Sequence, residues 1–166
     1  MNTKDTLKVT GLSILASAFF YSNVYAQNFG VINGYTINLR ENSNLDSNVI
    51  KTVDNGDNIE IIDKENEFFK VKIDGNEGYV SDEFVKLTKA DGVITGSNVN
   101  VRETPDANGN IVGRLDSDDP IVISGQSGDW FEIEYGSGTA FINKDFVYSE
   151  FGNQLEEVNV SDIIKN

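Results

Sequence analysis

An internal repeat constrains the fold of this chain more than any other feature of its sequence. Shifting the sequence by 62 positions places residues 30–85 on residues 92–147 without a gap, and 15 of the 56 aligned positions are identical. The apolar positions also stay in phase along the alignment. Because self-similarity at a fixed period indicates one structural unit used more than once, the sequence predicts two tandem modules of the same fold.

Each copy has the pattern of short β-strands joined by tight turns. In the first copy Phe69, Val71 and Ile73 alternate with other residues, as half-buried strands require, and their counterparts in the second copy alternate in the same way. Asp74-Gly75 follows, where a hairpin turn is expected. Neither copy sustains a helical period. Short strands in so few residues can form only a small closed or nearly closed barrel, so we predict an all-β chain.

The first 26 residues have the pattern of a signal peptide. Lys4 and Lys8 form a basic region, an apolar stretch runs over about residues 9–21, and a small-x-small cleavage signal ends at Ala26. The apolar stretch is short for a membrane span. We therefore expect export with cleavage before residue 27, and the alternative is an uncleaved amphiphilic anchor.

The repeat divides the rest of the chain. We expect module 1 over residues 28–88, module 2 over residues 90–149, a short linker at about residues 86–91, and a tail over residues 150–166. The tail could be a linker into a further domain. Alternatively, a short amphipathic helix could start in it, with the apolar residues Leu155, Val158, Ile163 and Ile164.

The composition excludes several classes of function. The chain has no Cys and no His, which removes disulfides, thiol nucleophiles, Cys or His zinc sites and Ser-His-Asp catalysis. The net charge is -14, and loss of residues 1–26 would leave 11 basic and 26 acidic residues, a charge of -15. Such a charge argues against nucleic acid and against anionic membrane surfaces as partners.

Four motifs occur in the same order in both copies. The first copy has Ile37-Asn38-Leu39-Arg40, Val53-Asp54-Asn55-Gly56, Glu67-Phe68-Phe69-Lys70-Val71 and Gly78-Tyr79-Val80. The second copy has Val99-Asn100-Val101-Arg102, Leu115-Asp116-Ser117-Asp118, Asp129-Trp130-Phe131-Glu132-Ile133 and Ala140-Phe141-Ile142. With these motifs, each copy resembles a bacterial SH3 domain (SH3b, the SH3-like barrel of Gram-positive cell-wall proteins). The copies depart from the family pattern at Phe68, Asp118 and Ala140.

The resemblance implies an extracellular binding module of the kind attached to peptidoglycan hydrolases of the NlpC/P60 or amidase type. A small barrel offers no deep cleft in which a pair such as Glu65 and Glu67 could act as acid and base, so we expect no enzyme and no cofactor. We expect a secreted, monomeric protein that binds peptidoglycan or its peptides at the cell wall. The alternative is a protein interaction or spacer module, which could form the N-terminal part of a larger peptidoglycan hydrolase.

Two aromatic residues are the main candidates for ligand contact. Phe68 and Trp130 each precede a core-facing Phe, so strand alternation places them on the opposite face, either exposed or beneath the loop that follows the Asn-x-Arg motif. An aromatic ring there could stack on a peptide or a sugar. Tyr35, Tyr79 and Phe141 are candidate companions in the ligand-binding surface.

Arg40 and Arg102 recur at equivalent positions of the two copies. A guanidinium could bind a peptide carboxylate through two parallel hydrogen bonds, and on this basis both are candidate ligand-binding residues. The alternative, which we favour, is a structural role as a loop anchor or as the partner of Glu41 or Glu103.

Acidic residues near the turns could suggest calcium, but the pattern is incomplete. Asp116, Asp118 and Asp119 lie close together, and carboxylates are calcium ligands. Residues 106–110 begin like a calcium loop, but Ile111 occupies the position of the required Gly and no Glu closes the loop. We therefore expect solvated turn residues and no metal site.

Overall fold

The computed structural model describes residues 28–158, and this part of the chain is all-β. The expected signal peptide and the pair Ile163-Ile164 lie outside the described residues. The strands of the first half are β1 (Asn28–Ile32), β2 (Ile37–Arg40), β3 (Val49–Val53), β4 (Asn58–Glu65), β5 (Phe68–Ile73), β6 (Asn76–Ser81) and β7 (Val85–Ile94). Those of the second half are β8 (Val99–Arg102), β9 (Ile111–Leu115), β10 (Pro120–Ser127), β11 (Trp130–Tyr135), β12 (Gly138–Asn143) and β13 (Val147–Tyr148).

Three short 3₁₀ turns complete the described structure. They are η1 (Asp82–Phe84), η2 (Lys144–Phe146) and η3 (Gly152–Gln154). Within residues 28–158 no helix has the length and apolar character needed to cross a membrane.

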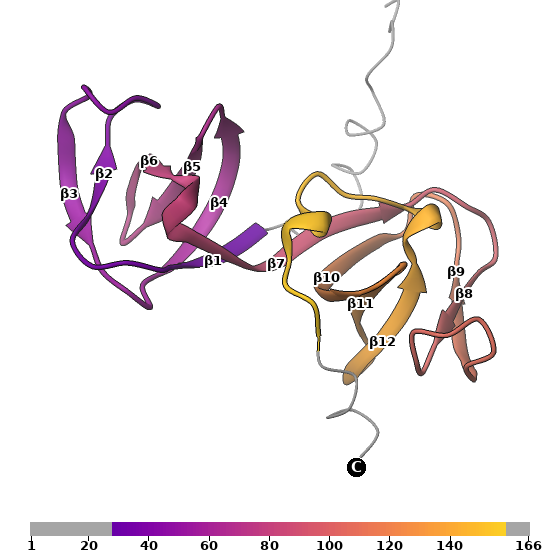
Figure 1. Cartoon of the computed structure of the whole chain (residues 1–166). Coiled ribbons are helices and arrows are strands. Elements are labelled where there is room, and N and C mark those ends of the chain that lie inside the picture. Colours follow the sequence, from indigo (N-terminus) through magenta and orange to yellow (C-terminus); the bar gives the residue numbers. More distant parts are fainter. Residues whose placement is uncertain (1–27, 159–166) are drawn as a thin grey trace, which may run out of the picture.

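The strands form two small barrels that lie side by side (Figure 1). The hydrogen-bonded order is β3-β2-β6-β5-β4-β1-β7 in the first barrel and β7-β10-β11-β12-β8-β9 in the second, with β13 also paired to β7. The registers repeat: Gly30 lies opposite Ile59 in the first barrel, and Gly92 lies opposite Ile121 in the second. The predicted all-β fold with two equivalent barrels is confirmed.

Strand β7 belongs to both barrels and replaces the expected linker at residues 86–91. Its first half closes the first barrel by pairing with β1, with Ile32 opposite Val85. Its second half opens the second barrel, where Ile94 lies opposite Val147 of β13. The expectation of a linker was wrong because each barrel pairs its last strand with its first, and one continuous strand performs both tasks.

The alternation seen in the sequence produces the core of each barrel. Phe69, Val71 and Ile73 are buried on β5, as are Phe131 and Ile133 at the equivalent positions of β11. Most of the buried side chains of both barrels form one contiguous cluster. Burial of apolar surface is the main favourable term in folding. Because one cluster includes residues of both barrels, each barrel contributes to the stability of the other.

A lysine lies over the core phenylalanine in each barrel, but the two lysines come from different positions of the repeat. In the first barrel the Lys64 ammonium lies 5.0 Å from the centre of the Phe69 ring and pairs with Asp82 at 2.9 Å. In the second barrel Lys144, at the position of Asp82, lies over the equivalent phenylalanine and donates to Gln126, at the position of Lys64. The repeat has therefore preserved the interaction and exchanged the residues that make it.

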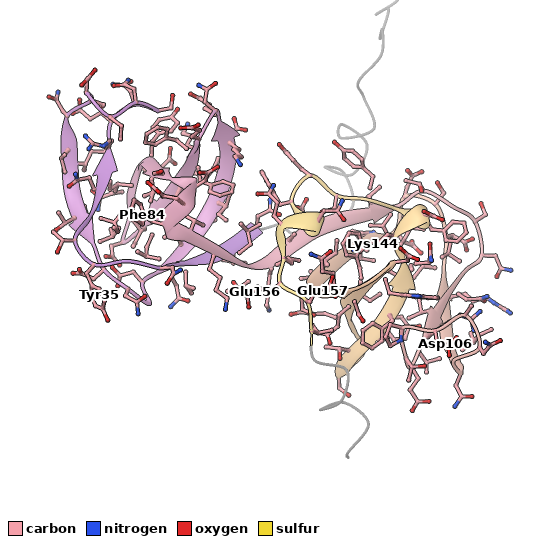
Figure 2. All side chains as sticks on the ribbon, in the orientation of Figure 1. Tyr35, Phe84, Asp106, Lys144, Glu156 and Glu157 are labelled. Carbon is pink, nitrogen blue, oxygen red and sulfur yellow. The ribbon has the colours of Figure 1, made fainter. Side chains whose placement is uncertain are left out.

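The segment after β13 packs between the two barrels. Phe151 is 2% exposed, and its ring meets Phe69 of the first barrel edge-on, with centroids 5.8 Å apart. The next residue, Gly152, lies against Phe131 of the second barrel. Glu156, labelled in Figure 2, pairs with Lys86 of β7 at 2.8 Å.

The described part of the tail, up to residue 158, packs against the barrels and contains a 3₁₀ turn rather than the start of an amphipathic helix. The alternative of a linker into a further domain stays a prediction. Leu155 is buried just after η3, and Glu157 forms a parallel bridge with Gln126 of β10. The backbone N–H of Val158 donates to the carbonyl of Gln126 at 2.7 Å. The apolar residues of this segment therefore serve the barrel contacts rather than one face of a helix.

Candidate functional site

Each barrel carries a shallow groove beside its Asn-x-Arg strand. Groove 1, on the first barrel, has a volume of about 220 Å³ and is lined by Thr36, Ile37, Asn38, Arg40, Leu45, Phe68, Ser81, Glu83 and Phe84. Groove 2, on the second barrel, has a volume of about 290 Å³ and is lined by Ser97, Asn98, Val99, Asn100, Arg102, Ala107, Trp130, Asn143 and Phe146.

The two grooves occupy the same place in the repeat. Eight of the nine residues that line groove 1 have their counterpart, 62 positions later, in the lining of groove 2. In both barrels the walls come from the strand that ends in Arg, the loop after it, the first residue of β5 or β11, and the 3₁₀ turn. The fold therefore builds the same concave surface twice.

The two arginines hold the loops that border the grooves. Nη1 of Arg40 donates to the carbonyl of Ser47 at 2.9 Å, and Nη1 of Arg102 donates to the carbonyl of Gly109 at 2.7 Å. The favoured loop-anchor role is confirmed, and no ion pair with Glu41 or Glu103 occurs in residues 28–158. Both side chains also line their grooves, so their role as ligand-binding residues stays a prediction.

The aromatic candidates of the two grooves differ in exposure. Trp130 is half-buried in the wall of groove 2. Phe68 lines groove 1 but is only 7% exposed, which agrees with the alternative that it packs beneath its neighbours. Groove 2 therefore offers a ligand more aromatic surface at this position.

Three predicted companions do not line the grooves. Tyr35 is 80% exposed and lies at the edge of the first barrel (Figure 2). Tyr79 is half-buried on β6, and its hydroxyl donates to Glu65 at 3.0 Å. Phe141 is 1% exposed, so its proposal as a contact residue is wrong in this structure. It lies opposite Arg102 of β8 and Glu132 of β11, and side chains directly opposite each other on neighbouring strands interact.

Sequence reasoning missed the aromatic residues of the 3₁₀ turns. Phe84 and Phe146 line grooves 1 and 2, and Phe146 is 45% exposed. A signal was present, because these two positions are identical in the repeat although they follow a polar turn. Asn38 and Asn100 were also missed, since their recurrence fits a fold requirement equally well.

Aspartates of this cluster accept backbone N–H groups, one from a distant turn and one from their own turn. Asp116 accepts the N–H of Asn98 at 2.8 Å, and Asp119 accepts the N–H of Asp116 at 2.8 Å. The first barrel has the same two contacts from Asp54 and Asp57. Among residues 28–158, no group of three or more Asp, Glu, Cys or His side chains is placed to hold a metal ion.

One titratable group near the first groove is perturbed. The hydrogen bond from Tyr79 to the Glu65 carboxylate raises the pKa of the Tyr79 phenol above its ordinary value of 10.0, and burial and the charges of Glu65 and Asp63 add to this shift. The anionic phenolate is disfavoured beside carboxylates.

Comparison with known families identifies the two barrels. Residues 36–86 and 97–148, together more than half of the chain, match the family described as the bacterial SH3 domain. The chain belongs to the bacterial SH3 domain family. Each barrel is thus one SH3 module, and the resemblance seen in the four sequence motifs is confirmed. All nine residues that line each groove lie within one matched segment.

The solved structures that match this chain share little sequence with it. NlpC2 from Trichomonas vaginalis is 16% identical with a TM-score of 0.40, and the match covers 85% of this chain and 54% of that protein. NlpC1 from Trichomonas vaginalis is 19% identical with a TM-score of 0.39, and the match covers 85% and 51%. The chain thus spans about half the length of both.

A shorter structure is matched over nearly its whole length. The structure named Endolysin LysPBC5 CBD is 15% identical with a TM-score of 0.36, and the match covers 77% of this chain and 97% of that one. No curated protein matches the chain.

Proposed function

We propose that this protein is an exported, non-catalytic protein that binds peptides of peptidoglycan through the grooves of its two SH3 modules. The observation that carries the proposal is the repeated groove, with an aromatic wall and an anchored arginine at equivalent positions. Aromatic rings give large contact area with few rotatable bonds. The basic and apolar pattern of residues 1–26 supports export to the wall.

Two grooves on one molecule favour binding to a polymer. Each groove is shallow, with a volume below about 300 Å³, so a single contact is expected to be weak. A second groove on the same molecule makes the second contact intramolecular. A wall that presents the same peptide many times would therefore be held more tightly than a free peptide.

The charge of the protein sets the expected salt dependence. The chain carries 27 acidic and 13 basic residues, so anionic wall polymers repel it over distances of about 10 Å at 0.1 M salt. Contacts inside the grooves are short-range. Moderate salt should therefore strengthen retention on the wall.

The test is sedimentation of the purified protein with peptidoglycan sacculi at low and moderate salt. Trp130→Ala should weaken the apparent affinity for sacculi by at least about tenfold, because aromatic residues dominate such contact surfaces. Tyr35→Ala is the matched control, since Tyr35 is exposed outside the grooves, and it should bind like the parent. A folded parent that stays in the supernatant at every salt concentration would refute the proposal.

A second function is favoured by the acidic surface. A net charge of -14 suits a basic protein partner, because complementary charge steers association. In that case the modules would serve as interaction or spacer units, and capture of a basic exported protein would occur without retention on sacculi. Such binding would weaken with salt, opposite to the behaviour expected for the wall.

A further inference from the structure

We infer that the two grooves have diverged, and that groove 2 selects peptides with a free carboxylate whereas groove 1 does not. This inference rests on the proposed function and names the ligand chemistry of one of its two sites. It starts from the acidic residue at the edge of each groove. Glu83 lines groove 1, but Asp145, its counterpart, is absent from the lining of groove 2.

One methylene group accounts for this difference. Glu83 and Asp145 occupy the same position of the 3₁₀ turn, and both are exposed. The longer Glu83 side chain reaches the groove and accepts a hydrogen bond from Ser81 at 3.4 Å. The shorter Asp145 side chain does not reach the groove lining. Groove 1 thus presents a carboxylate to its ligand, whereas none of the residues that line groove 2 is acidic.

The polar groups of groove 2 are left with hydrogen-bond donors. The Asn100 Oδ1 accepts from Nε of Arg114 at 3.0 Å, and the Asn143 Oδ1 accepts from the N–H of Asp145 at 3.0 Å. Since both partners can only donate, these contacts fix the orientation of the two amides. Their NH₂ groups make no hydrogen bond with another residue in the range 28–158.

Arg102 adds the positive charge. One of its five N–H donors binds the carbonyl of Gly109, and in the described part of the chain no carboxylate forms an ion pair with it. A planar guanidinium with donors to spare matches the two oxygens of a carboxylate. The single lining arginine in an acidic protein favours a singly charged carboxylate over a doubly charged phosphate.

Groove 1 also has an asparagine and an arginine, Asn38 and Arg40, in its lining, but it differs from groove 2 at the positions around them. Thr52 stands at the position of Arg114 and Ser81 at the position of Asn143. Glu83 would repel a ligand carboxylate next to Arg40. Groove 1 should therefore prefer a neutral or amine-bearing peptide segment.

The chain offers a reporter for each groove. Trp130 is the one tryptophan of the chain, so its fluorescence reports on groove 2. The double variant F68W/W130F moves the tryptophan to groove 1 by exchanging residues that the repeat itself uses at these positions. The probes are acetyl-Gly-Gly-Ala with a free carboxylate, the same peptide ending in a carboxamide, and glycerol phosphate.

In groove 2 the free carboxylate should bind about tenfold more tightly than the carboxamide, because charge-assisted hydrogen bonds are roughly twice as strong as neutral ones. Asp145→Glu returns a carboxylate to the groove without changing the net charge, and it should remove most of this preference. F68W/W130F should show no preference for the carboxylate, and adding Glu83→Gln should create one.

Equal affinity for the two peptides, or no response of Trp130 at millimolar peptide, would overturn the inference. Tighter binding of glycerol phosphate would also overturn it and would identify a phosphate site. Retention on sacculi together with equal affinities would leave the proposed function intact. Loss of both results would refute the proposed function as well.

Discussion

At the scale of single residues, comparison of the two modules separates structural residues from candidates for binding. Arg40 and Arg102 are identical in the repeat because each anchors a loop carbonyl. Asp54 and Asp116 are identical because each accepts a backbone N–H. Identity between copies therefore reports mainly on backbone groups that need a partner, and differences between copies are the better guide to ligand selectivity.

Tyr79 gives a prediction about pH at this scale. Its phenol donates to Glu65, and its pKa is raised above 10.0. The hydrogen bond needs the neutral phenol, so its contribution to stability is fully present below pH 10.0 and is lost as the pH rises through the raised pKa. Glu65→Gln should lower the pKa of Tyr79 toward 10.0, measured as a tyrosinate absorbance difference against Tyr79→Phe. Glu67→Gln is the control, and an equal shift in both variants would contradict the assignment.

At the scale of strands, the close approach of β2 to β6 limits the size of the side chain at position 78. A methyl group added at Gly78 of β6 would lie 2.7 Å from the backbone oxygen of Arg40 and 2.9 Å from Cγ of Leu39. The second module carries Ala140 at the equivalent position, where it is buried. The first barrel therefore leaves less space between these two strands than the second barrel does at the equivalent position.

We expect Gly78→Ala to destabilise the protein by about 1–3 kcal/mol, the usual cost of overpacking. Urea unfolding measures the change. Gly138→Ala is the matched control, because a Cβ there meets nothing within 4 Å, and it should change stability by less than about 0.5 kcal/mol. Similar stability of the two variants would mean that β2 moves to accommodate the methyl group.

At the scale of the whole molecule, two features join the modules. Strand β7 runs through both barrels, and Phe151 brings the segment after the second barrel onto Phe69 of the first. Lys86 and Glu156 add an exposed ion pair to the same contact, which is worth little by itself. The modules should therefore unfold together and keep a fixed relative orientation of their grooves.

Phe151→Ala should lower stability by about 3–5 kcal/mol, the range for removal of a buried Phe side chain. Calorimetry measures the loss, and amide chemical shifts should change around Phe69 as well as in the second barrel. Tyr148→Ala is the control, since Tyr148 is exposed, and it should leave both unchanged. Shift changes confined to the second barrel would refute a contact that couples the modules.

The sequence by itself determined the repeat, the all-β character and the residues that face each core. These features follow from local alternation and from matching positions, which any reader of the chain can count. The same reasoning made Phe68 and Trp130 the main candidates for ligand contact and favoured a structural role for Arg40 and Arg102.

Only the tertiary structure decided which residues share a surface. It buried Phe141, left Tyr35 outside groove 1, and placed Phe151 against a ring 82 positions earlier in the chain. It also showed that Glu83 reaches its groove while Asp145 does not. These outcomes depend on contacts between distant segments and on side-chain reach, and neither property is encoded in the local period of the sequence.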